Sequence, residues 1–340
     1  MGKKIFILST ILICICSSTF CDVIITPIKP KYRSIRFPDD LHGWLTGYGR
    51  VFYTTDGGET WERQFMPIDS SKPESSNKTP LGFVGSILWA DQYSAMVRSE
   101  SGIITFNANL GYGYENFLAK DILSRLGYTL FTDRVSGWGV GPMGKVFLTK
   151  DKGETWNVLQ TPQHDVLHNL FAVSPENIWV VGNNILQNST DGGRNWRLCQ
   201  LPFSHDLLSI KFVNENIGWA CGYNGLILKT EDAGKTWQKK ETLYSHRTVL
   251  NELLFINAHQ GFVVGTRWHK NENMDEDTQE GIILYTEDGG DNWKQLITKL
   301  GEDFIDIASP PNGQVWVISR QGKLLRTKDN GATWDSITIE

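Results

Sequence analysis

One eight-residue motif recurs along the chain and limits its fold more than any other feature. Each intact copy reads Ser/Thr-x-Asp-x-Gly-x-x-Trp. The six copies are Thr54–Trp61, Thr149–Trp156, Ser189–Trp196, Thr230–Trp237, Thr286–Trp293 and Thr327–Trp334. Their tryptophans follow one another at intervals of 95, 40, 41, 56 and 41 residues, so the first interval is about twice the usual one. A period near 40 residues is typical of repeat architectures and of propeller blades in particular.

The long first interval contains a seventh, degenerate copy of the motif. Asn107, Asn109, Gly111 and Tyr114 keep the spacing of the intact copies with altered residue types. We therefore predict seven repeat units.

The chemistry of the motif indicates a turn between two strands. An aspartate can accept hydrogen bonds from the backbone of its own turn, glycine supplies a positive φ, and the tryptophan buries a large apolar surface. Calcium-binding loops need further oxygen ligands and a late glutamate, whereas here tryptophan follows at once. We predict a structural role, and no catalytic one, for the residues at the aspartate position: Asp56, Asn109, Asp151, Asp191, Asp232, Asp288 and Asp329.

The sequence around the motif repeats as well. Ile35–Trp44 aligns with Ile210–Trp219 without a gap, and each unit contains four apolar, strand-like segments. The predicted fold is an all-β, seven-bladed β-propeller with the motif between the third and fourth strands of each blade. Because a propeller closes only as a whole ring, residues 22–340 should form one domain. The net charge of −5 argues against a broad nucleic-acid-binding surface.

The first 21 residues have the features of a signal peptide. Lys3 and Lys4 precede an apolar run from Ile5 to Cys16 and then three small residues. We expect export to a periplasmic, extracellular or outer-surface location. A retained membrane anchor is an alternative, but the run is short for a spanning helix. Lipid attachment at Cys21 is another, although Phe20 is a poor fit to a lipoprotein signal. The remaining cysteines, Cys199 and Cys221, are expected to be free and buried.

Two insertions and four arginines single out one end of the predicted propeller. The first-to-second-strand turns and the motif turns should share one end, the box face, and the other connections the opposite end, the loop face. Insertions at 69–79 and 266–280 fall on the loop face, where binding residues are often found. The second-to-third-strand turns of units one, two, six and seven, which are consecutive in a closed ring, contain Arg50, Arg98, Arg267 and Arg320. Guanidinium groups suit carboxylate or phosphate recognition, so we predict a partner-binding arc; the alternative is a solvated rim.

Three histidines occupy similar places in consecutive units but do not predict a metal site. His164, His205 and His246 each precede the first strand of a unit. Although histidines bind zinc, equivalent points on neighbouring blades should lie too far apart for one ion. We predict no metal and no cofactor.

The repeats resemble a known family. The turn motifs are similar to the Asp-box of sialidases, and the longer unit, as in Ile210–Trp219 followed by Gly225–Trp237, resembles the photosystem II stability and assembly factors and their relatives in non-photosynthetic bacteria. The match covers Arg33 to Glu340. The resemblance implies a secreted or lumenal protein without a catalytic site, which holds a membrane protein partner through an arginine-rich patch. The acidic insertion in unit six departs from the pattern and puts the same partner in doubt.

The main alternative is a sialidase-like or other glycoside hydrolase propeller. Ile35–Pro38 faintly resembles the sialidase Arg-Ile-Pro motif, but Arg36 aligns internally with Lys211, so repetition already accounts for it. Sialidases also have six blades. We therefore predict an exported, monomeric, non-enzymatic propeller that binds a protein partner, with carbohydrate binding left open.

Overall fold

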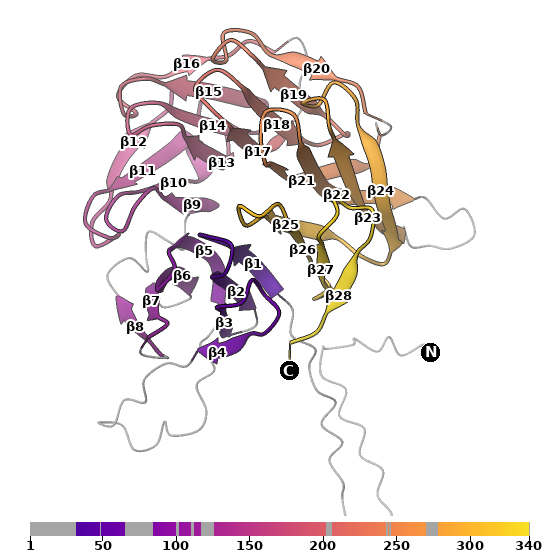
Figure 1. Ribbon diagram of the computed structural model, residues 1–340. Helices are drawn as coiled ribbons and strands as arrows, with labels where there is room; N and C mark the ends of the chain where they lie inside the picture. Colours follow the sequence, from indigo (N-terminus) through magenta and orange to yellow (C-terminus); the bar gives the residue numbers. More distant parts are fainter. Residues whose placement is uncertain are drawn as a thin grey trace, which may run out of the picture. The chain divides into compact units, whose positions relative to one another are not determined.

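Seven four-stranded antiparallel sheets make up the fold, which confirms the predicted all-β, seven-bladed propeller (Figure 1). The computed structural model describes residues 32–47, 49–64, 84–99, 102–109, 112–116, 126–201, 206–242, 244, 246–269 and 278–339. The predicted signal peptide, Cys21 and the insertion at 69–79 lie outside these residues. Each sheet contains four consecutive strands, so each blade corresponds to one sequence unit.

The strands occupy equivalent places in every blade. The first strands are β1 (Tyr32–Arg36), β5 (Val84–Ala90), β9 (Tyr128–Phe131), β13 (Leu167–Ala172), β17 (Leu207–Phe212), β21 (Thr248–Phe255) and β25 (Phe304–Ala308). The second strands are β2 (Gly43–Gly47), β6 (Ser94–Ser99), β10 (Gly137–Val140), β14 (Ile178–Gly182), β18 (Gly218–Gly222), β22 (Gly261–His269) and β26 (Val315–Ser319). The third strands are β3 (Arg50–Thr54), β7 (Ile103–Asn107), β11 (Lys145–Thr149), β15 (Ile185–Ser189), β19 (Ile227–Thr230), β23 (Thr278–Thr286) and β27 (Leu324–Thr327). The fourth strands are β4 (Glu62–Gln64), β8 (Tyr112–Asn116), β12 (Asn157–Gln160), β16 (Arg197–Leu198), β20 (Gln238–Lys240), β24 (Lys294–Leu300) and β28 (Asp335–Ile337).

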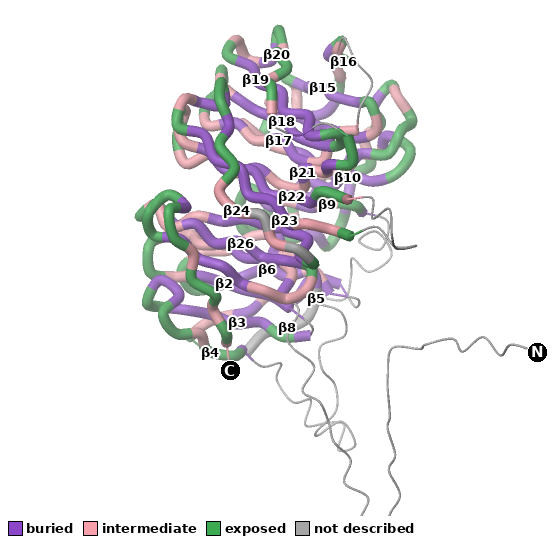
Figure 2. Tube along the Cα trace, turned by 90° about the vertical axis from the view of Figure 1, so that its right-hand side faces the viewer, coloured by how far each residue is buried: buried purple, intermediate pink, exposed green. Residues whose placement is uncertain are grey.

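First strands contact the first strands of neighbouring blades around the ring, and therefore line its centre. Fourth strands are the shortest in several blades and carry exposed side chains, as expected for an outer edge. Burial follows the same order, with the inner strands buried and the connecting turns exposed (Figure 2). Within the described residues, a 3₁₀ turn, η3 (Pro142–Gly144), connects β10 to β11.

Hydrogen bonds within each motif turn engage its aspartate. In the first blade, Thr54 Oγ1 donates to Asp56 Oδ1 at 2.7 Å and accepts from the Gly58 amide at 2.9 Å. Asp56 Oδ1 also accepts the Thr60 amide at 2.9 Å. Equivalent hydrogen bonds recur around Asp151, Asp191, Asp232, Asp288 and Asp329. The aspartate carboxylate therefore holds the two sides of the turn together through hydrogen bonds.

The second blade has the degenerate form of this turn. Asn109 lies between β7 and β8, as predicted, and its amide donates to Asn107 Oδ1 at 3.0 Å. Gly111 lies outside the described residues.

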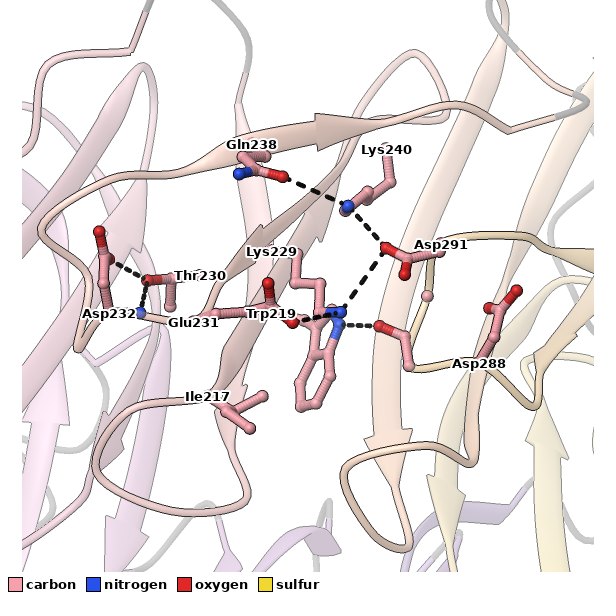
Figure 3. Close-up of polar contacts among 12 residues, drawn as sticks. Ile217, Trp219, Lys229, Thr230, Glu231, Asp232, Gln238, Lys240, Asp288 and Asp291 are labelled. Carbon is pink, nitrogen blue, oxygen red and sulfur yellow. Dashed lines mark hydrogen bonds and ion pairs between the residues drawn. The ribbon is translucent and has the colours of Figure 1, made fainter.

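Aromatic side chains pack the blades against one another. Between the fifth and sixth blades, the Trp219 and Phe255 rings stack at 3.5 Å, and Trp219 Nε1 donates to the Gly289 carbonyl at 3.0 Å. Lys229 is buried at the same junction and lies between Glu231 and Asp291 (Figure 3). Blade junctions, rather than single blades, therefore contain the hydrophobic core.

The sixth blade differs from the expected simple loop insertion. Its second and third strands, β22 and β23, extend for nine residues each and pair through to His269 and Thr278. The insertion at 266–280 is therefore a lengthened hairpin whose two arms are strands, with residues 270–277 outside the described part.

Both cysteines of the described chain are free and buried, as the sequence analysis expects. Burial raises the pKa of both thiols, so neither has the low pKa of a reactive cysteine.

Candidate functional site

The four predicted arginines lie at the second-to-third-strand ends of their blades. Arg50 opens β3, Arg98 is near the end of β6, Arg267 is near the end of β22, and Arg320 follows β26. Their surroundings differ, and these differences decide which guanidinium groups are available to a partner.

Arg98 is the most enclosed of the four. It is half-buried, and its Nη1 donates to the Leu126 carbonyl in the third blade at 2.9 Å. Burial lowers the pKa of its guanidinium from the usual value. This contact joins the second and third blades, so Arg98 has a structural role at that junction.

Arg320 is exposed but has a carboxylate partner. Its Nε donates to Asp303 Oδ2 at 2.6 Å, and the Asp303 side chain is only 12% exposed. Asp303 also accepts hydrogen bonds from Asn251 and Thr266 of the sixth blade. The charge of Arg320 is thus largely neutralised within the protein.

Arg50 and Arg267 are both exposed, and in the described part of the chain neither has a carboxylate partner. The Arg267 guanidinium lies 5.3 Å from the centre of the Tyr244 ring, a cation–π arrangement. Because Arg267 is also exposed, its N–H groups remain accessible to solvent. These two arginines are therefore the members of the set with unused binding capacity.

A groove of about 290 Å³ on the loop face is lined by Trp268, the residue after Arg267. Tyr223 and Trp268, which are 42% and 39% exposed, line it together with Arg247. The Trp268 amide donates to the Arg247 carbonyl at 2.8 Å, which fixes the lengthened hairpin to the connection before β21. Exposed aromatic rings beside arginines are typical of protein-binding surfaces.

The histidines do not assemble into a site within the described residues. His164 is exposed and lies 3.4 Å from Gln160 Nε2, and His246 is exposed on another connection. His205 lies outside the described part. No group of three metal-ligating side chains was found among the residues that the structure describes.

The centre of the ring contains a charged cavity that the sequence analysis missed. Its volume is about 210 Å³, and first strands of six blades supply its lining. Arg36 and Lys211 face Asp306 and Glu252 across it: Arg36 Nη1 lies 3.3 Å from Asp306, and Lys211 Nζ lies 3.2 Å from Glu252. Tyr128, Leu130 and the rings of Phe37 and Phe171 complete the wall.

The acidic residues of this cavity stabilise the charged forms of Arg36 and Lys211. Burial is the largest influence on Arg36 and opposes its charge, but attraction to Asp306 and the other acidic groups of the cavity together outweighs burial and raises the pKa of Arg36 above its usual value. Burial likewise opposes the charge of Lys211, and Glu252 raises its pKa above the usual value. Both cations stay protonated throughout the physiological pH range.

Internal alignment already contained the signal for this cavity. Arg36 aligns with Lys211, which places both on the same level of the central channel. Glu252 and Asp306 each align with Ser209, which lies two residues before Lys211 on the first strand and therefore one position further along the channel. Equivalent positions in a ring face a common centre. The alignment of Arg36 with Lys211 therefore argues against a sialidase arginine and also indicates charged groups around the channel.

Comparisons with known proteins agree with the fold and the repeat type. Residues 201–272 match the family model of the photosynthesis system II assembly factor YCF48, and residues 52–63 match the BNR/Asp-box repeat. The photosystem II stability/assembly factor HCF136 of Arabidopsis thaliana is 23% identical over 259 residues, which cover 69% of this chain and 62% of that protein. The chain thus spans less than two thirds of that relative. The photosystem II assembly lipoprotein Ycf48 of Prochlorococcus marinus is 25% identical over 287 residues, covering 69% and 83%.

A solved structure, YCF48 bound to D1 peptide, has the same fold. It superposes with a TM-score of 0.62 at 20% sequence identity and covers 88% of this chain and 94% of its own. The chain is a BNR-repeat propeller that resembles the photosystem II assembly factors, as predicted from its repeats.

Proposed function

We propose that this chain is an exported, non-enzymatic binding propeller that holds an acidic segment of a protein partner on its loop face. Arg50 and Arg267 are the principal contacts in this proposal, and Arg98 and Arg320 have supporting roles. The observation that carries it is the exposed Arg267 guanidinium, stacked on Tyr244 beside the groove of Tyr223 and Trp268. The resemblance to YCF48, whose structure contains a D1 peptide, supports a peptide segment as the ligand.

The same geometry explains why the four arginines should contribute unequally. Arg320 would have to exchange Asp303 for the partner, and Arg98 would have to leave the Leu126 carbonyl. Because a charge that is already paired gains little from a second partner, most of the binding free energy should come from Arg50 and Arg267.

Export rests on the sequence near the start of the chain. Lys3, Lys4 and the apolar run from Ile5 to Cys16 match a signal peptide, and the Prochlorococcus relative is a lipoprotein. No helix in the described part of the chain is long and apolar enough to cross a membrane. Mass spectrometry of the mature protein tests the proposed cleavage. A lipid adduct on Cys21 would show instead that the protein is lipid-anchored.

The glycoside hydrolase alternative requires two carboxylates with separate acid and base roles. The carboxylates of the central cavity, Glu252 and Asp306, are instead each hydrogen-bonded to the protein and paired with a cation. This arrangement favours the binding function. Hydrolysis of sialosides or xyloglucan by the purified protein would overturn it.

The direct test uses a fluorescent peptide of alternating Asp and Glu and measures its dissociation constant. The Arg50→Glu, Arg267→Glu double variant should bind at least tenfold more weakly, since two charge-assisted contacts become repulsive. The Lys152→Glu, Lys235→Glu double variant, which reverses two exposed charges on the box face, is the matched control. Equal weakening by the control would mean that the arginines act only through the net charge of the protein. Unchanged binding by the Arg50→Glu, Arg267→Glu variant would refute the proposed face.

A further inference from the structure

The central cavity has an unequal supply of hydrogen-bond donors and acceptors. Its two acidic residues are engaged by the fold. Asp306 accepts the Ile35 amide at 3.1 Å and the Ile307 amide at 2.9 Å, in addition to Arg36. Glu252 accepts the Ser209 hydroxyl at 2.6 Å, in addition to Lys211. Asp306 therefore has little accepting capacity left for a ligand, whereas both contacts of Glu252 use Oε1.

The two cations retain donors. Arg36 uses Nη1 for the Ile35 carbonyl and Asp306, while its Nε and Nη2 have no acceptor among the described residues. Lys211 has Glu252 as its single carboxylate partner in the same part of the chain. An ammonium has three donors and a guanidinium five, so both groups can bind a further oxygen ligand.

Exposure to the cavity follows the same division. The side chains of Arg36 and Lys211 are 35% and 25% exposed, whereas those of Glu252 and Asp306 are 15% and 11% exposed. The two cations are thus more accessible than the two carboxylates, although the four charges sum to zero.

Apolar side chains form the rest of the wall. Phe37, Phe171, Leu130 and Leu254 line the cavity beside the charged groups. A ligand that fits must place an anionic group against the cations and an apolar body against these side chains. The volume of about 210 Å³ limits it to a small molecule or to one side chain.

We propose that this cavity is a binding site for a small carboxylate with an apolar body. The carboxylate contacts Arg36 and Lys211, and the body packs on Phe37 and Phe171. The site is formed by the ends of first strands that precede the box-face turns, so it opens on the face opposite the arginines of the loop face. It is independent of the peptide-binding function proposed above.

The test measures binding of phenylacetate to the purified protein by titration calorimetry, with phenylacetamide as the uncharged control. Phenylacetate should bind saturably and the amide at least tenfold more weakly, because the amide cannot form charge-assisted hydrogen bonds.

Variants locate the site. Lys211→Met should weaken phenylacetate binding by about tenfold or more, whereas Lys239→Met, the same change on the exposed fourth strand of the same blade, should leave it unchanged. Phe171→Trp should abolish binding by filling the cavity without altering any charge. It keeps the proposal testable if Lys211→Met fails to fold. The Arg50→Glu, Arg267→Glu variant should bind phenylacetate normally.

Three results would overturn the proposal. They are no binding of phenylacetate by the unmodified protein at millimolar concentration, equal binding of the amide, and equal affinity in folded Lys211→Met and Lys239→Met.

Discussion

Two junctions between neighbouring blades are built from similar contacts, but one joins consecutive sequence units and the other joins the two ends of the chain. The fifth and sixth blades follow one another in sequence, so the polypeptide itself connects them. The seventh and first blades meet only because the ring closes. Their comparison shows how a propeller whose blades each contain four consecutive strands can hold its ends together.

The shared design has an aromatic part and an ionic part. In each junction a buried tryptophan of one blade, Trp219 or Trp316, packs on a phenylalanine of the next, Phe255 or Phe37. In each, a buried cation just before a motif turn contacts the acidic residue after the glycines of the next motif. These ion pairs are Lys229–Asp291 at 3.6 Å, shown in Figure 3, and Arg326–Glu59 at 2.7 Å.

The aromatic contact is closer at the consecutive junction. Trp219 stacks on Phe255 at 3.5 Å with an interplanar angle of 8°, and its Nε1 donates to Gly289. Trp316 lies 5.5 Å from Phe37 at 30°, and its buried Nε1 has no partner within the described residues. A Cβ on Gly58 would lie 2.5 Å from the Trp316 ring, so this glycine is needed for the approach as well as for its φ of 88°.

Polar contacts cross the ring-closing junction as well, and two of them involve backbone amides. Asp306 of the seventh blade accepts the Ile35 amide and pairs with Arg36, and the Asn312 amide donates to Asp40. Glu59 accepts from Lys328 as well as from Arg326. Among the described strands, none is shared between the first and seventh blades. Contacts that involve side chains therefore close this ring. In a propeller whose last blade combines strands from both chain ends, the backbone hydrogen bonds of that blade would close it instead.

The largest expected effect concerns the tryptophans. Trp219→Ala and Trp316→Ala should each lower the free energy of unfolding by about 3–5 kcal/mol, as truncation of a buried aromatic side chain usually does. Trp219→Ala should cost about 1 kcal/mol more, because it also removes a hydrogen bond. Urea denaturation followed by circular dichroism measures both.

Trp268→Ala serves as the control for this pair. Trp268 is 39% exposed at the end of the lengthened hairpin, so its loss should cost less than about 1 kcal/mol. A larger cost for Trp316→Ala than for Trp219→Ala would mean that the ring-closing junction depends more on packing than its geometry indicates.

A smaller effect is expected for the acidic residues of the central cavity. Asp306→Ala should destabilise the protein by about 2 kcal/mol, since it leaves the buried Ile35 amide without its acceptor. Glu252→Ala, at the consecutive junction, should cost about 1 kcal/mol because its partners Ser209 and Lys211 are side chains that can reorient. Thermal unfolding compares them, and equal costs would contradict a special role for Asp306 in ring closure.

The smallest effect should come from the outer ion pairs. Glu59→Gln and Asp291→Asn should each cost at most about 1 kcal/mol, because both carboxylates are about half exposed. Hydrogen bonds from Lys328 to Glu59 and from Lys240 to Asp291 lower the pKa of these carboxyls from their ordinary values of 4.5 and 3.8.

The sign of the pH dependence follows from these lowered pKa values. Each carboxylate contributes its full stabilisation above its ordinary pKa and loses it as the pH falls through the lowered value. Each variant should therefore be less stable than the unmodified protein near neutral pH, and the difference should shrink in acid. Unfolding measured from pH 6 downward checks this, and a difference that persists at the lowest pH would exclude the ion pair as its cause.

The fold was predictable because local and global signals coincide in this chain. Each motif specifies its own turn through Asp232 and its equivalents, and the repeat period specifies the blade. Even Asn109, with neither the aspartate nor the tryptophan, was placed correctly by spacing alone. The hairpin of the sixth blade was not predicted as strand, because Thr266–Glu280 contains many polar residues without a clear alternation, and its pairing extends a ladder fixed elsewhere.

The candidate sites were less predictable than the fold. Sequence alone places Arg320 on a second-to-third-strand turn, but it does not show that Asp303, seventeen residues earlier, neutralises it. Likewise it does not show that Tyr244 orients Arg267. The cavity charges come from the first, fifth, sixth and seventh blades, so they become neighbours only after ring closure.

The coincidence of blade and sequence unit has an evolutionary consequence. A gene duplication or deletion that spans one unit, such as 207–240, adds or removes an entire sheet and leaves every other sheet intact. In a ring whose last sheet takes strands from both chain ends, the same event would have to preserve that composite sheet. Changes of blade number are thus a short genetic step for a chain of this type.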